Sequence, residues 1–110
     1  MIVEVFLSTA LLCFSGTCHN ALVGVTTPTG QYEYVKTPID DPLYGATVAP
    51  FAVDNSGGVF AIHQTWLGAP YEQRDVRILG DDRIMINGCI NIPPDVYEQL
   101  PQYSELIIHP

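Results

Sequence analysis

Basic residues are scarce in this chain of 110 residues, which has four lysines and arginines against twelve aspartates and glutamates. Binding to a nucleic-acid backbone or to an anionic membrane surface requires clustered cations, so the net charge of −8 argues against both kinds of partner. The sequence also lacks an apolar run long enough to span a membrane, and it contains no internal repeat or low-complexity segment. Because 47% of its residues are hydrophobic and only 15% are charged, we expect one globular domain over residues 1–110.

The first residues lack the features of a secretory signal peptide. Residues 5–14 are apolar enough for its hydrophobic region, but the residues before them include Glu4 and no Lys or Arg. The residues before Cys13 and Cys18 also lack a small-residue cleavage pattern. We therefore expect this segment to fold as a strand. If the protein is exported, its targeting sequence is expected outside this chain.

The chain has few cysteines, and two of them are close together. Cys13 and Cys18 flank a four-residue connection that contains Gly16 and is typical of a hairpin turn. Cross-strand partners at these positions would bring their Cβ atoms near the range of a disulfide. A Cys13–Cys18 bridge with a free Cys89 fits an oxidising compartment, whereas three reduced cysteines would fit a cytosolic domain. The spacing alone leaves both possibilities open.

The rest of the pattern is mostly that of β-strands. Apolar, β-branched or alternating runs predict strands at residues 2–7, 10–14, 19–25, 31–36, 47–53, 59–63 and 105–109. Turn residues at 26–30 and 54–58 separate some of these runs, and the prolines and aspartates of 37–45 predict a loop. Residues 65–85 have little periodicity, and one helix is expected from Pro93 to about Leu100. The sequence thus predicts an all-β or β-rich fold with one short helix.

Cys89 stands in the stretch Ile86–Ile92, between β-branched residues and beside a glycine, which indicates a strand or tight bend shortly before the expected helix. Gly88 can adopt backbone angles closed to other residues and lets a substrate approach the main chain. A cysteine at the start of a helix has a stabilised thiolate, and free backbone N–H groups there can hold an oxyanion. The alternative is a buried, inert cysteine, which is the commoner fate of a lone thiol.

His63 is the candidate base for this thiol. It ends an apolar strand and opens the irregular segment of about twenty residues that returns to Cys89, an unusual length for a small domain unless the segment serves function. A cysteine nucleophile needs a base or cationic partner, and histidine is the usual one. The alternatives are a solvated or purely structural histidine. His19, beside the expected hairpin, and His109, near the end of the chain, are weaker candidates.

Together these residues resemble a known family. His63 followed by Gly88-Cys89-Ile90-Asn91 is similar to the catalytic signature of the L,D-transpeptidases (YkuD-like domains). The resemblance extends to Thr27-Pro28-Thr29-Gly30 with Tyr32, to the helix at residues 94–100 and to the last strand at 106–108. Where the family has Ser/Thr-His before Gly-Cys, this chain has Ile86-Asn87, and its spacer is longer. Asn87 can donate a hydrogen bond but supplies no charge, so a diverged subgroup is expected.

The resemblance implies a small mixed β-sandwich and a cysteine acyltransferase that acts on peptidoglycan stem peptides. Cys89 would be the nucleophile and His63 the base; Gly88 and Asn87 would form the oxyanion hole, and Asn91 would orient the histidine. The thioester would pass to an amine in a transpeptidase or to water in an L,D-carboxypeptidase. No metal or cofactor is implied. A catalytically silent binding module and a small disulfide-stabilised structural protein are the competing hypotheses.

Substrate binding is expected in the segment between His63 and Cys89, which holds three of the four basic residues. Stem peptides carry carboxylates, which arginine binds bidentately, so Arg74, Arg77 and above all Arg83 are candidates. Trp66 and Tyr71 are candidates for a pocket wall or lid. Alternatively, the aromatics are core residues, and the arginines pair with neighbouring carboxylates, namely Glu72, Asp75, Asp81 and Asp82. A monomer in the periplasm or bacterial cell envelope is expected, with a cytoplasmic location left open.

Overall fold

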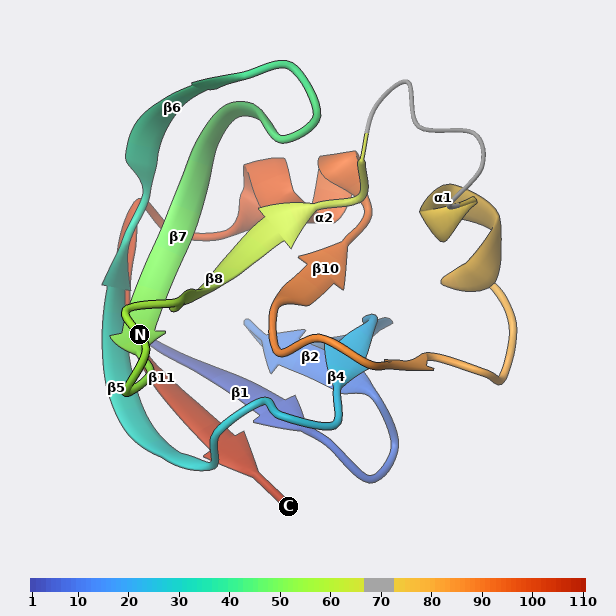
Figure 1. The fold of residues 1–110 in the computed structure, drawn as a ribbon. Helices are drawn as coiled ribbons and strands as arrows, with labels where there is room; N and C mark the ends of the chain where they lie inside the picture. Colours follow the sequence, from blue (N-terminus) through green and yellow to red (C-terminus); the bar gives the residue numbers. More distant parts are fainter. Residues whose placement is uncertain (67–72) are drawn as a thin grey trace.

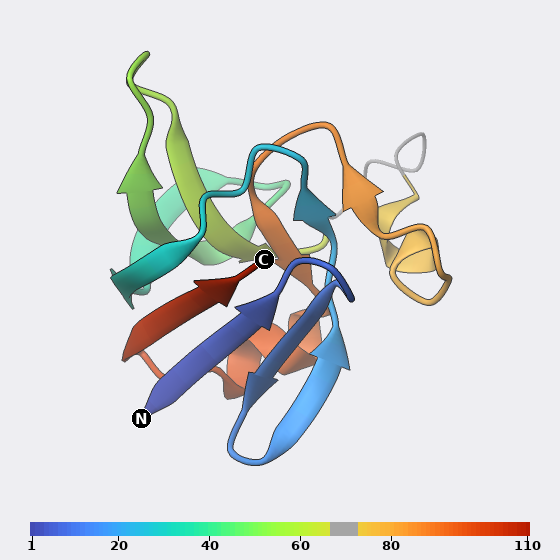
Figure 2. The ribbon, with the colours of Figure 1, turned by 90° about the horizontal axis from the view of Figure 1, so that it is seen from below.

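The first of two larger β-sheets contains both the first and the last strand of the chain. The computed structural model describes residues 1–66 and 73–110, and the strand order in this sheet is β3-β2-β1-β11-β5. β1 and β11 run parallel, and every other neighbouring pair is antiparallel. Figure 2 shows β11 and β1 side by side in the middle of this sheet. Its strands are β1 (Ile2–Phe6), β2 (Leu11–Phe14), β3 (Thr17–Asn20), β5 (Gly30–Val35) and β11 (Tyr103–His109).

The second sheet carries the strands on either side of the candidate site, in the order β10-β8-β7-β6. β10 runs parallel to β8, and the other pairs are antiparallel (Figure 1). Its strands are β6 (Thr37–Asp41), β7 (Gly45–Val53), β8 (Val59–Gln64) and β10 (Ile90–Ile92). A short parallel pair joins β4 (Val23–Gly24) to β9 (Ile84–Met85), and the two helices are α1 (Arg74–Arg77) and α2 (Pro94–Gln99). Neither described helix is long and apolar enough to cross a membrane.

Alternation along the strands sends one set of side chains into a shared apolar core. In β1, for example, Val3 and Val5 are fully buried, whereas Ile2 points to the other face and is about half exposed. α2 adds its own buried face to the same cluster. The largest contributors from the two sheets and α2 are Val3, Val5, Leu12, Tyr34, Ile62, Ile90, Ile92, Val96, Tyr97, Leu106 and Ile108.

Most of the expected elements are present. The turn at residues 54–58 joins β7 to β8, where Asp54 Oδ1 accepts the backbone N–H groups of Ser56 and Gly58. The helix after Pro93 is α2, and it begins with proline as expected. The loop predicted at residues 37–45 is wrong over its first half, because residues 37–41 form β6. A proline is tolerated there because β6 is an edge strand, where a missing N–H leaves no ladder partner unsatisfied.

The hairpin between β2 and β3 carries a disulfide. Cys13 and Cys18 are direct register partners and are bonded to each other, so the predicted bridge is present. Cys89 is the free cysteine. The turn between the strands places Ser15 and Gly16 at positive φ, a backbone conformation that glycine adopts without strain.

Candidate active site

His63 lies near the end of β8 and is only 2% exposed. Its Nδ1 is 2.8 Å from the carbonyl oxygen of Gln64. A carbonyl oxygen can only accept, so Nδ1 carries the hydrogen of the neutral ring, and the lone pair is on Nε2. Burial lowers the pKa of His63 to about 4; the Gln64 hydrogen bond opposes this shift and the charge of Arg74 adds to it. His63 is therefore neutral at physiological pH, with Nε2 as its basic atom.

Aromatic rings and an arginine enclose this histidine. The ring of Tyr44 meets the imidazole edge-on at a centroid distance of 4.6 Å, and it meets the ring of Trp66 at 6.1 Å. The guanidinium carbon of Arg74 is 3.5 Å from the centroid of the Trp66 ring, a stacked cation–π geometry. These contacts bring the start of α1 against the end of β8. We call His63, Tyr44, Trp66 and Arg74 the histidine cluster.

Asn91 connects β10 to the histidine cluster. It is the direct register partner of His63 in the parallel β8–β10 pair, and it is fully buried. Its backbone exchanges two hydrogen bonds with Leu22, of 2.8 and 2.9 Å, and its Oδ1 accepts a hydrogen bond of 2.9 Å from Arg74. The Nδ2 of Asn91 is buried without a hydrogen-bond partner among the described residues. The backbone of Asn91 is thus held by Leu22 and by pairing with β8, and its side chain is held by Arg74.

Cys89 immediately precedes β10 and is half-buried. Its Sγ is 3.8 Å from the backbone carbonyl oxygen of Val59, at the beginning of β8, and it forms no hydrogen bond with His63. The expectation that the thiol directly precedes a helix is wrong, because β10 and Pro93 separate Cys89 from α2. Pairing with β8 over Ile90–Ile92 extends the chain here, and the helix begins only after that pairing ends. The N-terminus of α2 therefore does not stabilise this thiolate.

The backbone before the thiol is tightly enclosed. The hydroxyl of Thr27 donates to the carbonyl oxygen of Gly88 and accepts the backbone N–H of Gly24, both at 2.9 Å. A Cβ at Gly24 would overlap the Asn87 backbone, and one at Gly88 would overlap the ring of Phe60. Glycine is therefore required at both positions by close approach. Asn87 is half-buried, and its Oδ1 has no partner among the described residues.

Two of the three candidate arginines donate hydrogen bonds to backbone carbonyl oxygens of this chain. Arg83 donates to the carbonyl oxygens of Thr9, Ala10 and Gly80, which ties the segment before β9 to the turn between β1 and β2. Arg77 donates to the carbonyl oxygens of Asp82 and Ile84, both at 2.8 Å, and its charge pairs with the exposed Asp82 carboxylate at 3.6 Å.

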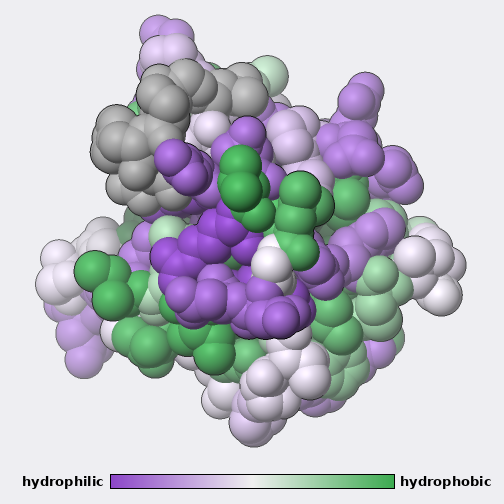
Figure 3. Space-filling view, turned by 90° about the vertical axis from the view of Figure 1, so that its right-hand side faces the viewer, coloured by the Kyte–Doolittle hydropathy of each residue, from purple (hydrophilic) through white to green (hydrophobic). Residues whose placement is uncertain are grey.

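The side of the molecule that carries α1 has a mostly hydrophilic centre with separate hydrophobic areas around it (Figure 3). Exposed apolar residues near α1 and β9 include Val76, Leu79 and Ile86, the last of which is 92% exposed just before Asn87. Tyr71, the other aromatic candidate, lies outside the described residues. In the described ranges, no group of three or more His, Cys, Asp or Glu side chains is placed to hold a metal ion.

The structure brings together His63, Asn91, Trp66 and Arg74, and it leaves Cys89 out of hydrogen-bond contact with this group. Sequence reasoning missed Tyr44, which lies after β6 in a segment that had been expected to be a loop. It also missed the structural role of Thr27, although the Thr-Pro-Thr-Gly motif had pointed to this residue. The Thr27 hydroxyl forms hydrogen bonds with the backbone of Gly24 and of Gly88. Because tertiary packing brings Gly88 to Thr27, the sequence carries no local signal for this role.

Comparison with solved structures shows the fold. The chain is similar to the crystal structure of Mycobacterium tuberculosis L,D-transpeptidase 1, with a TM-score of 0.54 and 20% sequence identity. The similarity covers 99% of this chain and 61% of that one, so this chain spans less than two thirds of the matched protein. The β-rich fold predicted from sequence is thus confirmed as L,D-transpeptidase-like. The sequence matches no protein-family model and no curated protein.

Proposed function

We propose that this chain is a cysteine acyltransferase that acts on peptidoglycan stem peptides, as an L,D-transpeptidase. The observation that carries the proposal is the fold, which matches L,D-transpeptidase 1 along 99% of this chain and has Cys89 immediately before a strand that runs parallel to the strand of His63. A fold alone does not fix an activity. The added support comes from the nature of the residues: a free thiol, a neutral buried imidazole and an adjacent buried amide.

In the proposed reaction, Cys89 Sγ attacks the carbonyl carbon between the diamino acid and the terminal D-alanine. His63 Nε2 takes the thiol proton and delivers it to the departing D-alanine amine as the C–N bond breaks. An acceptor amine then attacks the thioester, the C–S bond breaks, and the thiol is restored. For this step the Cys89 thiol must leave the Val59 carbonyl oxygen, which it contacts at 3.8 Å, and approach the imidazole.

The environment of His63 favours proton transfer during the attack over a preformed ion pair. Its low pKa disfavours an imidazolium in the free protein, so the thiol and imidazole begin neutral. The Gln64 carbonyl fixes the tautomer that leaves Nε2 free, and we propose that Asn91, held by Arg74, orients the ring. Backbone N–H groups at Gly88 and Cys89, with the Asn87 amide, are proposed to bind the oxyanion.

Two related activities are the alternatives. If water reaches the thioester before an amine, the same chemistry is that of an L,D-carboxypeptidase, which trims a tetrapeptide to a tripeptide. A catalytically silent peptidoglycan-binding module is favoured by two observations: Cys89 and His63 share no hydrogen bond, and Asn87 stands where the family has histidine. The disulfide is consistent with a periplasmic or envelope location, which we include in the proposal.

For substrate binding, we propose Arg74 and Trp66 first, because they border His63. Arg77 and Arg83, and with them Tyr71, stay in the proposal as outer contacts. A stem carboxylate would have to compete with the backbone carbonyls that Arg77 and Arg83 now bind.

The test is intact-mass spectrometry of a tetrapeptide stem incubated with the protein, alone and with a second stem as acceptor. A cross-linked product, with loss of D-alanine, supports a transpeptidase; a tripeptide alone supports a carboxypeptidase. Cys89→Ala should abolish either product, and His63→Gln should reduce it strongly. His19→Gln is the matched control and should react as the parent does. Unchanged substrate with an alkylation-resistant Cys89 would establish the silent module instead.

A further inference from the structure

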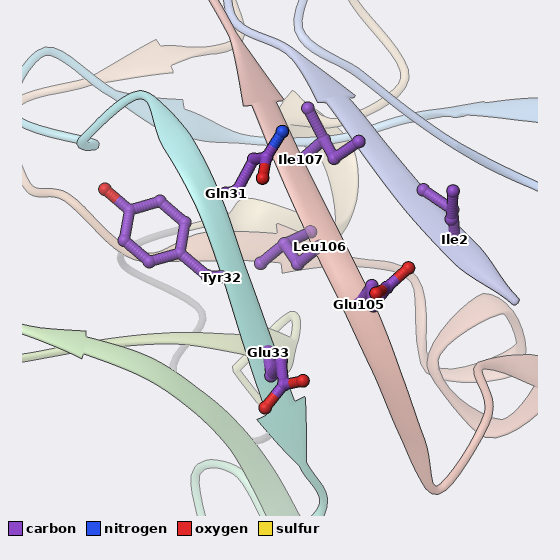
Figure 4. Close-up of a pocket in the computed structure, with 7 residues that line it drawn as sticks. All are labelled: Ile2, Gln31, Tyr32, Glu33, Glu105, Leu106 and Ile107. Carbon is purple, nitrogen blue, oxygen red and sulfur yellow. The ribbon is translucent and has the colours of Figure 1, made fainter.

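A groove opens on the outer face of the five-stranded sheet, over β1, β5 and β11. Its volume is about 560 Å³. Figure 4 shows the side chains of Gln31 and Glu33 on β5, Glu105 and Ile107 on β11, and Ile2 on β1 arranged along it. These are the alternate residues of their strands that point away from the core. The groove is therefore separate from the histidine cluster, whose residues lie on β8, on α1 and in the segments after β6 and β8.

Two carboxylates face each other across this groove. Glu33 and Glu105 are direct register partners in the antiparallel β5–β11 pair, and both are exposed. Like charges at directly opposed positions destabilise a sheet. The hydroxyl of Tyr103 donates to Glu33 at 3.0 Å, which supplies a hydrogen bond but no positive charge. The pair thus concentrates negative charge at one point of the face.

No basic residue of this chain neutralises the pair. All four Lys and Arg side chains lie in the described ranges, and none forms an ion pair with Glu33 or Glu105. His109, on the same face, instead binds Glu4 at 2.8 Å. The basic side chains have contacts elsewhere: Lys36 with the Tyr97 carbonyl and ring, Arg74 with Asn91 and Trp66, Arg77 with Asp82 and Ile84, and Arg83 with Thr9, Ala10 and Gly80. The two carboxylates are thus available to a cation from outside the chain.

The groove offers an apolar surface next to this charge. Ile2 is 47% exposed and lies beside Glu105 in Figure 4, and the half-buried Ile107 lies farther along β11, next to Gln31. A lysine side chain has the matching composition, since it combines an aliphatic stem with a terminal ammonium. A second copy of this chain is a poor occupant. A two-fold contact through this face would bring the same carboxylates together in a chain of net charge −8.

We propose that this groove binds a lysine-bearing segment of a partner polypeptide, with the ammonium between Glu33 and Glu105 and the stem along Ile2 and Ile107. Charge complementarity is the basis of the choice of partner. The binding site does not depend on the acyltransferase proposal. Binding measurements test this site, and their result does not depend on the activity of Cys89.

The test is calorimetric titration of the full chain with a blocked five-residue peptide of alternating valine and lysine, at about 0.15 M salt. We expect saturable binding that Glu33→Gln with Glu105→Gln weakens by roughly tenfold or more. Asp40→Asn with Asp81→Asn is the matched control, because it removes the same charge from exposed sites elsewhere and should leave the affinity unchanged.

The same peptide with acetylated lysines distinguishes charge recognition from apolar contact, and we expect it not to bind. Equal weakening by the two double variants would mean attraction to the net charge alone and would overturn the proposal. Binding that the Glu33 and Glu105 changes leave intact, or equal binding of the acetylated peptide, would overturn it as well. Folding is not at risk in the key variant, because removing two opposed charges relieves repulsion in the sheet, and its thermal midpoint should not fall.

Discussion

Protonation of the buried His63 is expected to dominate the acid sensitivity of this fold. Because burial lowers the pKa of His63 from 6.5 to about 4, the unfolded chain takes up this proton at a higher pH than the folded chain does. Above pH 6.5 the ring is neutral in both states and costs nothing. As the pH falls from 6.5 toward 4, the unfolded state gains the proton first, so the free energy of unfolding decreases.

The magnitude follows from the difference in proton affinity. Each tenfold change in affinity is worth about 1.4 kcal/mol, so lowering the pKa from 6.5 to about 4 corresponds to a loss of about 3 kcal/mol. For a domain with a total stability of roughly 5–15 kcal/mol, this is a substantial part. Carboxylates also titrate over this range, so the contribution of His63 has to be isolated as a difference between two proteins.

The variant is His63→Asn, which keeps a side-chain N–H near the Gln64 carbonyl and has no titrating group. Urea unfolding of both proteins, measured at several pH values between about 7.5 and about 4, gives the free energies of unfolding. We expect the parent to lose about 3 kcal/mol more than the variant on acidification. A constant difference between parent and His63→Asn would refute the reasoning, because it would mean that the folded state protonates this ring as readily as the unfolded state.

Three further outcomes are expected. Arg74→Met leaves the buried Oδ1 of Asn91 without a donor and should lower the free energy of unfolding by about 2 kcal/mol. It also removes the charge of Arg74 and should therefore raise the pKa of His63, as followed by NMR titration. Gly24→Ala forces the backbone beside the thiol to move and should cost about 3 kcal/mol. Gly80→Ala, whose Cβ would make only an ordinary contact of 3.6 Å with the Arg77 carbonyl oxygen, should change stability by less than about 0.5 kcal/mol in the same denaturation assay. Reducing the Cys13–Cys18 bond, which closes a short loop, should cost about 2 kcal/mol in the chain-entropy model, and an unchanged thermal midpoint after reduction would contradict it.

Local signals in the sequence predicted those elements whose structure is decided locally. Asp54 and Gly58 supply the turn that joins β7 to β8, since an aspartate that accepts nearby N–H groups and a glycine are what such a turn requires. A hairpin between Cys13 and Cys18 was predicted from a four-residue connection that contains glycine, although the spacing left open whether the two cysteines are bonded. Proline at the start of α2 likewise marks a helix without reference to the rest of the molecule.

Features decided by tertiary packing could not be predicted in this way. α1 has only four residues and begins after Gln73, whose backbone is left-handed, so its position depends on the burial of Arg74 against Trp66 and Asn91. β10 separates the thiol from α2 because it pairs with β8; the β-branched residues around Cys89 indicate a strand or bend, but they do not indicate its partner. The candidate site was therefore predicted as a set of residues, but the arrangement of that set was not.

The parallel pairing of β1 with β11 has a consequence for how the molecule is made. The central strand pair of one sheet joins residues near opposite ends of the chain, such as Val3 with Leu106. A contact of this sequence separation closes nearly the longest loop that the chain permits, and such contacts form slowly. During synthesis, β1 leaves the ribosome long before its partner exists. The backbone edge of β1 that pairs with β11 therefore stays without this partner until the last strand emerges, so the centre of this sheet is completed late in folding.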